Sequence, residues 1–342
     1  MTCRAVLICP GRGTYNKAEL GYLSRHHTGA PLLETFDDLR RAEGQTPVTE
    51  LDSAERFATA THTPGDAASP LIYTCSYLDR MALADDIEIV AVTGNSMGWY
   101  TALAAAGALD AKGGFQVVNT MGRLMQEASI GGQLVYPCAG PDWRPDPARR
   151  AALLDTVRQI DGEGAVLRLS IDLGGMLVLA GDAAGLAEFE ASVPRIEDRF
   201  PMRLPHHAAF HTELQEPVAE AGRAALPAAL FSQPALPMID GRGAIWWPHA
   251  TDTALLHEYT LGAQVTQTYD FARAIRIAAQ EFAPDMFIVT GPGTTLGGAV
   301  AQSLISCGWQ GLDSKAAFQE RQEESPLLVS MGLEDQRNIV TG

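Results

Sequence analysis

Residues 94–98, Gly-Asn-Ser-Met-Gly, are the part of the sequence whose residue types and spacing most clearly indicate chemistry. They fit the nucleophile elbow, a sharp strand-to-helix turn that exposes a serine, with a glycine two positions away on each side to leave room for the strained backbone. An apolar, β-branched run at 87–93 precedes them and a helix-forming run at 99–109 follows. The alternative is an ordinary glycine-rich turn, but this context favours the elbow. The sequence therefore predicts Ser96 as a nucleophile.

A serine hydroxyl reacts at neutral pH only when a base takes its proton, and the sequence offers eight histidines for that role. In α/β-hydrolases the histidine follows the last strand, whereas no histidine of this chain lies beyond His257. That order argues against an ordinary α/β-hydrolase. His211 lies where the chain leaves a predicted small unit and re-enters a large one, at the rim of the expected cleft. We predict His211 as the base and expect the other histidines to be solvated or hydrogen-bonded.

An oxyanion formed during such a reaction needs hydrogen-bond donors that are already in place. In an elbow the first donor is the backbone N–H of the residue after the nucleophile, here Met97. A second donor must come from a neighbouring strand end. The glycine-containing loop 10–14 is the natural supplier because glycine permits close backbone approach, although it could also be a simple turn.

Two other kinds of site have weaker support. His207 and His211 are four residues apart, as zinc ligands on a helix are, but Ala208 stands where a metalloprotease has Glu and no Cys or carboxylate lies at ligand spacing upstream. A dinucleotide fingerprint after the first strand would need a third glycine where this chain has Asn16. We therefore expect no metal and no bound cofactor.

The elements that must position these residues alternate between short strands and longer helices. Apolar strands at 4–9, 87–93 and 286–290 each end in a glycine turn. This pattern is typical of an α/β domain with a buried parallel sheet, in which ligands bind at the carboxyl ends of the strands. We expect the three turns to share one cleft.

The order of predicted strands and helices changes in the middle of the chain. Between residues 131 and 204 the pattern predicts a strand, a helix, two strands, a helix and a last strand at 197–204, the β-α-β-β-α-β order of a ferredoxin-like unit. We therefore predict a large α/β-hydrolase-like subdomain from residues 1–130 and 205–312 and an inserted small subdomain at 131–204. Residues 313–342 are expected to form a C-terminal tail with a solvated surface helix and a loose end.

The composition excludes several classes of protein. The chain has 342 residues, 46% hydrophobic and 19% charged, which is globular composition, and a formal net charge of −16 without a basic run, which excludes a nucleic-acid role. Its five cysteines are scattered without CxxC spacing, as expected in a reducing compartment. No stretch is apolar enough for a membrane helix or a signal peptide. We predict a soluble cytoplasmic protein.

Five segments, taken in order, resemble the malonyl-CoA:acyl-carrier-protein transacylase family and the acyltransferase domains of polyketide synthases. They are Pro-Gly-Arg-Gly-Thr at 10–14, Gly-Asn-Ser-Met-Gly-Trp-Tyr at 94–100, Met-Gly-Arg-Leu-Met-Gln-Glu-Ala at 121–128, Ala-Phe-His at 209–211 and Gly-Pro-Gly at 291–293. The resemblance implies the two-subdomain fold and ping-pong acyl transfer, with Ser96 acylated and His211 as base. It also implies that a backbone carbonyl orients the histidine, at a position that looks equivalent near Asp270, and that phosphopantetheine enters as part of the substrate.

Several positions of the predicted acyl pocket and oxyanion hole depart from the family pattern. Members that take malonyl groups have an arginine at the place of Met121, and a buried carboxylate without such a partner is penalised by several kcal/mol. We therefore predict an uncharged acyl group. Asn95 and Trp99 replace the usual His and Glu, with Trp99 expected at the pocket mouth, and Phe210 either narrows the pocket or packs in the core. Arg12 replaces the usual Gln and either supports the oxyanion or binds a substrate carboxylate, which would rescue a charged substrate.

Three functions are compatible with these residues. The first is an acyltransferase that moves an uncharged acyl group between thioesters of CoA or an acyl carrier protein, in fatty acid or polyketide biosynthesis. The second is a hydrolase that removes acyl groups from carrier proteins with the same Ser-His dyad and water as acceptor. The third is a catalytically silent docking protein, which we rank last because it needs neither the serine nor the histidine.

Overall fold

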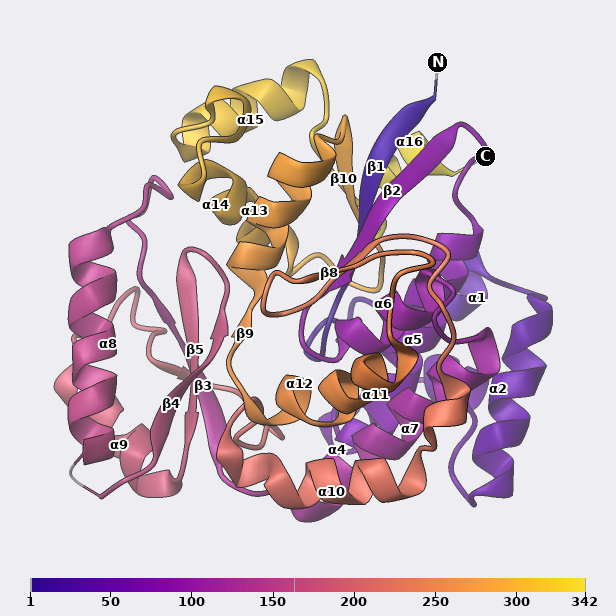
Figure 1. The fold of residues 1–342 in the computed structure, drawn as a ribbon, viewed down its shortest axis with the longest axis horizontal. Helices are drawn as coiled ribbons and strands as arrows, with labels where there is room; N and C mark the ends of the chain where they lie inside the picture. The colour runs from indigo at the N-terminus through magenta and orange to yellow at the C-terminus, as the bar shows by residue number, and fades with distance from the viewer. Residues whose placement is uncertain (1, 163, 342) are drawn as a thin grey trace.

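Two β-sheets organise the chain, one in each of two subdomains, as Figure 1 shows for the computed structural model, which describes residues 2–162 and 164–341. The larger sheet has the order β11-β10-β1-β2-β7-β8. Its pairs are parallel except for the antiparallel pair β7–β8. The strands of this sheet are β1 (Cys3–Cys9), β2 (Ile87–Gly94), β7 (Met238–Ile239), β8 (Ile245–Trp246), β10 (Met286–Val289) and β11 (Leu328–Ser330).

Strand β1 lies at the centre of the larger sheet because its sequence suits burial on both faces. Residues 5–9 of this strand are completely buried, as expected for a parallel strand covered by helices on both sides. The helices of the large subdomain are α1 (Tyr22–His26), α2 (Pro31–Ala42), α3 (Val48–Asp52), α4 (Thr59–His62), α5 (Gly65–Met81), α6 (Gly98–Ala105), α7 (Ala111–Ala128), α10 (Glu216–Ala225), α11 (Thr253–Leu261), α12 (Ala263–Thr266), α13 (Phe271–Phe282), α14 (Gly297–Ser306), α15 (Lys315–Glu324) and α16 (Glu334–Val340), with short 3-10 turns at Glu213–Gln215, Ala228–Leu230 and Trp309–Gly311. Side-chain caps define several of their starts: the Asp110 carboxylate, for example, accepts a hydrogen bond from the N–H of Gly113 at the beginning of α7.

The smaller sheet confirms the ferredoxin-like prediction. Its elements are β3 (Gly132–Pro137), α8 (Pro147–Gly162), β4 (Leu167–Asp172), β5 (Met176–Gly181), α9 (Ala183–Ser192), β6 (Met202–Arg203) and β9 (Tyr269–Asp270). The order is β6-β3-β5-β4-β9, and the first four strands have the connectivity of the β-α-β-β-α-β unit. Strand β9 comes from the large-subdomain part of the chain and pairs in parallel with β4. In Figure 1, α8 and α9 lie on the outer side of this sheet, so its other face is turned toward the large subdomain.

Two predictions about the chain were wrong. The last strand of the small subdomain is β6, two residues long instead of 197–204, because Glu197 and Asp198 adopt left-handed backbone conformations and Pro201 has no N–H to donate. Residues 328–340 are not a loose end. Strand β11 pairs with β10, and Arg337 of α16 is buried in an ion pair with Asp79.

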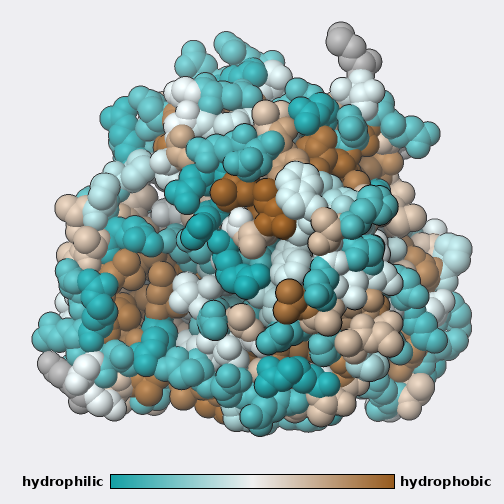
Figure 2. Space-filling view, in the orientation of Figure 1, coloured by the Kyte–Doolittle hydropathy of each residue, from teal (hydrophilic) through white to brown (hydrophobic). Residues whose placement is uncertain are grey.

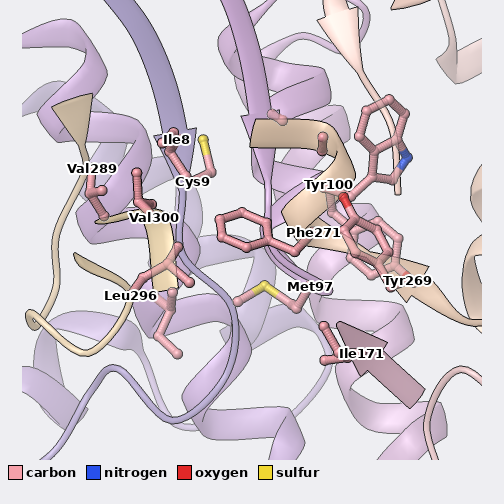
Figure 3. Close-up of a cluster of buried hydrophobic side chains, with 14 of the residues drawn as sticks. Ile8, Cys9, Met97, Tyr100, Ile171, Tyr269, Phe271, Val289, Leu296 and Val300 are labelled. Carbon is pink, nitrogen blue, oxygen red and sulfur yellow. The ribbon is translucent and has the colours of Figure 1, made fainter. Parts of the chain in front are cut away.

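One hydrophobic core extends through both subdomains. Figure 3 shows part of it, in which Met97 of the elbow lies between Leu296 of the large subdomain and Ile171 of the small one, with Phe271 above. The elbow is therefore anchored in the region where the two subdomains pack together.

Hydrophilic residues dominate the face of the molecule seen in Figure 2, with smaller hydrophobic patches among them.

Candidate active site

The elbow has the strained geometry that its sequence predicts. Ser96 lies between β2 and α6 with a φ of 57°, a left-handed conformation that is unusual for a residue with a side chain. A Cβ atom on Gly94 would lie 2.2 Å from the carbonyl of Gly98, and one on Gly98 would lie 2.1 Å from the carbonyl oxygen of Cys9. Both positions therefore require glycine because the backbones touch there.

The structure brings Ser96 and His211 together across the junction of the subdomains. The Ser96 Oγ lies 2.8 Å from the His211 Nε2. The other ring nitrogen, Nδ1, lies 2.6 Å from the backbone carbonyl oxygen of Gln264. Because a carbonyl can only accept, Nδ1 carries the proton and Nε2 is left to accept the proton of the serine. His211 also has a left-handed φ, of 57°, so backbone strain is concentrated in both members of the pair.

Burial keeps the imidazole of His211 neutral. The residue is 4% exposed, and burial lowers its pKa from 6.5 to about 4, while the hydrogen bond to the Gln264 carbonyl acts in the opposite direction. A neutral imidazole at pH 7 is the form that can accept a proton.

Asp270 does not lie beside His211, so the expected position of the orienting carbonyl was wrong. The Asp270 side chain accepts a hydrogen bond from the N–H of Arg273 and caps α13 instead. The orienting carbonyl is that of Gln264 in α12, six residues earlier. The short helix α12 ends before β9 begins, which carries Asp270 away from the histidine.

The Gln264 side chain links the same helix to the elbow. Its amide nitrogen donates a hydrogen bond to the Ser96 carbonyl at 3.0 Å, and its amide oxygen accepts one from the Tyr100 hydroxyl at 3.0 Å. The residue therefore holds the histidine with its backbone and the nucleophile with its side chain. Gln264 was not among the predicted residues, and no motif in the sequence marks it.

The backbone N–H groups of Met97 and Arg12 are among those near Ser96 that lack a hydrogen-bond partner within the described part of the chain. Loop 10–14 approaches the elbow so closely that a Cβ atom on Gly11 would lie 2.4 Å from the Asn95 carbonyl oxygen. The Arg12 side chain extends elsewhere. Its Nη2 donates to the carbonyls of Thr63 and His206, each at 3.0 Å, and its guanidinium lies 5.5 Å from the centre of the Phe210 ring.

A cavity of about 330 Å³ opens beside the Ser96–His211 pair. Asn95 and Phe210, two of the residues considered for the acyl pocket, line it, and so does Arg12. Its small-subdomain wall is apolar, formed by Val135, Ile171, Leu173, Met176, Val178 and Leu204.

Met121 and Trp99 do not line this cavity, so their predicted places in the acyl pocket were wrong. Met121 is completely buried, and its sulfur lies 2.7 Å from where a Cβ atom on Gly222 would be, so it packs against α10. Trp99 is also completely buried, and its indole N–H donates to the Thr260 hydroxyl at 3.0 Å. In both cases the helix turns the side chain toward neighbouring helices and away from the serine.

His207 lines the same cavity. Its Nδ1 lies 2.8 Å from the Gln133 amide oxygen, and burial together with the nearby Arg12 lowers its pKa to about 3. Among the described residues no group of three or more His, Cys, Asp or Glu could hold a metal ion. The described helices include none that is both long and apolar enough to cross a membrane.

The chain is similar to known acyl-transfer proteins. It is 29% identical over 211 residues to the malonyl CoA-acyl carrier protein transacylase of Bacillus subtilis (strain 168), covering 60% of this chain and 62% of that protein. It is 28% identical over 225 residues to the polyketide synthase GfsB of Streptomyces halstedii, covering 64% of this chain and 4% of that protein. The chain thus spans less than two thirds of each of these curated relatives, and no family model matches it.

The fold similarity extends over the whole chain. The malonyl-CoA:ACP transacylase of Synechocystis sp. PCC 6803 superposes with a TM-score of 0.73 at 19% identity, covering 99% of this chain and all of that one. These comparisons confirm the predicted fold and the resemblance to transacylases and polyketide synthase acyltransferases.

Proposed function

We propose that the protein is an acyltransferase that moves an uncharged acyl group between the phosphopantetheine thioesters of CoA and an acyl carrier protein. The observation that carries this proposal is the 2.8 Å approach of the Ser96 Oγ to the His211 Nε2, whose ring is held by the Gln264 carbonyl. Similarity to proteins named for transfer to an acyl carrier protein supports this choice of partner. A silent docking protein would not need a strained serine and a strained histidine that face one another.

The reaction would proceed in two half-reactions, acylation of Ser96 and transfer of the acyl group to the acceptor thiol. In the first, the Ser96 O–H bond breaks, the proton moves to the His211 Nε2, and Oγ bonds to the thioester carbonyl carbon. The carbonyl oxygen gains negative charge and accepts hydrogen bonds from the free N–H groups of Met97 and Arg12. When the C–S bond breaks, the leaving thiolate takes the proton from His211. The second half reverses these steps with the incoming thiol of the acceptor.

An uncharged acyl group suits the residues around the serine. Among the described residues that line the cavity, Arg12 is the only one with a permanent positive charge. Its Nη2, which a bidentate fork needs, is already occupied by the carbonyls of Thr63 and His206, so only single hydrogen bonds from Nη1 or Nε remain for a carboxylate. The apolar wall of the small subdomain favours hydrocarbon over charge.

The same apolar wall favours transfer over hydrolysis, because it limits the water that can reach an acyl-serine. The acceptor would then be a thiol on a flexible phosphopantetheine arm.

Intact-mass measurement of the protein after incubation with a panel of acyl-CoAs tests the proposal. We expect a mass increase equal to the acyl group with acetyl-CoA or butyryl-CoA, none with the Ser96→Ala variant, and transfer of the group to a holo acyl carrier protein added afterwards. Malonyl-CoA should label at least about 100-fold more slowly, because an unpaired buried carboxylate costs several kcal/mol and each step of about 1.4 kcal/mol is a factor of ten. Efficient malonyl loading would refute the uncharged substrate, rapid release of free acid without an acceptor would indicate a hydrolase, and the absence of any acyl-enzyme would refute the proposed function.

A further inference from the structure

A second imidazole, that of His207, lines the same cavity as the Ser96–His211 pair, and the proposed mechanism does not use it. Its hydrogen-bond partners determine which ring nitrogen carries the proton. The Phe210 carbonyl can only accept, so the Ser170 hydroxyl donates its single proton there, at 2.8 Å. Ser170 must then accept from the amide nitrogen of Gln133, at 2.7 Å.

This chain of bonds fixes the tautomer of His207. Because the Gln133 nitrogen points to Ser170, its amide oxygen is the atom 2.8 Å from the His207 Nδ1, and an oxygen of that kind can only accept. Nδ1 therefore carries the proton. Burial and the charge of Arg12 lower the pKa of the ring to about 3, so Nε2 keeps a free lone pair. Within the described chain no group hydrogen-bonds to Nε2.

His207 lies in the part of the cavity near Arg12, α5 and α7. The carbonyl of its neighbour His206 accepts from Arg12, which also bonds to Thr63, immediately before α5. At this end the lining is formed by Ser69 of α5, which is 1% exposed, and by Gly122 of α7, whose Cβ position is 3.1 Å from the Ser69 Oγ. At the other end the lining includes Thr295, which is exposed, and α14. A phosphopantetheine arm would enter past α14, and the acyl group would extend toward α5 and α7.

The lining of this cavity therefore includes an oriented acceptor, His207 Nε2, and a hydroxyl, Ser69 Oγ, that has no partner among the described residues. A substrate hydroxyl satisfies both groups at once, since it can donate to the imidazole and accept from the serine. A plain hydrocarbon leaves both unpaired when water is displaced, and a carboxylate brings its lone pairs against that of Nε2. We infer that His207 is a specificity residue and that the preferred acyl group is uncharged and carries a hydroxyl in its chain.

This inference rests on the proposed acyl transfer, and it is tested with two thioesters that differ by one hydroxyl, a hydroxybutyryl-CoA and butyryl-CoA. We expect kcat/KM for acylation of Ser96 to favour the hydroxylated thioester by roughly 10-fold or more, because a site built to bind a hydroxyl rejects the analogue that lacks it. His207→Asn keeps a donor for Gln133 at the Nδ1 position and removes the Nε2 acceptor, so the preference should fall to about onefold. His207→Gln places an oxygen near the Nε2 position and should restore part of the preference for the hydroxylated thioester.

The control is His206→Asn, one residue earlier. Its side chain is exposed and its φ is 58°, a left-handed conformation that asparagine adopts readily, so the preference should not change. An equal loss of kcat/KM for both thioesters in His207→Asn would show that His207 contacts the pantetheine arm or supports the fold, and would overturn the inference.

A binding measurement separates this inference from the chemistry. The Ser96→Ala variant should bind the hydroxylated thioester about 10-fold more tightly than butyryl-CoA in calorimetry. Equal binding would overturn the specificity role even if acylation occurs. A preserved binding preference without any acyl-enzyme in the wild type would refute the acyl transfer and leave the hydroxyl-binding site standing.

Discussion

Replacing Gln264 by leucine tests whether this residue fixes the position of Ser96 relative to His211. Leucine removes the hydrogen bonds to the Ser96 carbonyl and from the Tyr100 hydroxyl while keeping a backbone carbonyl for His211. Tyr100 is 2% exposed, so its hydroxyl finds no water in exchange. Leaving the buried Tyr100 hydroxyl unpaired costs about 1–3 kcal/mol of the free energy of unfolding, and the part-buried Ser96 carbonyl adds less than that.

The effect on the reaction should be larger than a loss of stability explains. A displacement of about 1 Å between reacting groups lowers a rate by on the order of 100-fold, and Gln264 hydrogen-bonds to both the elbow and His211. Rapid-quench intact mass measures the acylation rate, and urea denaturation measures stability. Asp270→Asn is the matched control, because asparagine still caps α13 and Asp270 lies outside the pair. Folded Gln264→Leu protein that acylates within about threefold of wild type would refute the reasoning.

Two further predictions concern pH and stability. Because burial lowers the pKa of His211 to about 4 and the base must be neutral to accept the serine proton, the acylation rate should stay constant as the pH falls from about 7 to about 5 and be halved near pH 4, in a pH–rate profile of kcat/KM. A decline centred near pH 6.5 would contradict the burial argument. Arg337→Met should lower the free energy of unfolding by about 3–5 kcal/mol in urea at pH 7, because Arg337 Nη1 lies 2.6 Å from an oxygen of the completely buried Asp79 and 2.9 Å from the Tyr22 hydroxyl. A loss below about 1 kcal/mol would show that the carboxylate is satisfied by its other partners.

The elements around the nucleophile were predictable because their causes are local. The apolar, β-branched run before the elbow can only be buried as a central strand, and β2 is found at 87–94. The two elbow glycines follow from backbone contact within the turn. The short β6 and the paired β11 were not predictable in the same way. The length of β6 depends on the turn at 197–198. Strand β11 depends on pairing with the edge of β10, which lies far away in sequence.

The residues around Ser96 also divide into those that the sequence predicted and those that it did not. Residue types and order were sufficient to predict the pair Ser96 and His211, which the structure places 2.8 Å apart, because the elbow and the return of the chain to the large subdomain are both features of order along the chain. The order of residues along the chain did not show which way the side chains of Met121 and Trp99 point. Each lies on a helix whose rotation is set by packing against α10 or α11.

Local backbone chemistry thus made the strand, the sharp turn and the serine at that turn predictable from the amino-acid order, since each depends on residues within a few positions of one another. The carbonyl that orients His211, the Gln264 link to the elbow and the tautomer of His207 arise from segments brought together by folding. Hydrogen bonds of this kind depend on distance and angle in space and leave no periodic or motif signal in the chain.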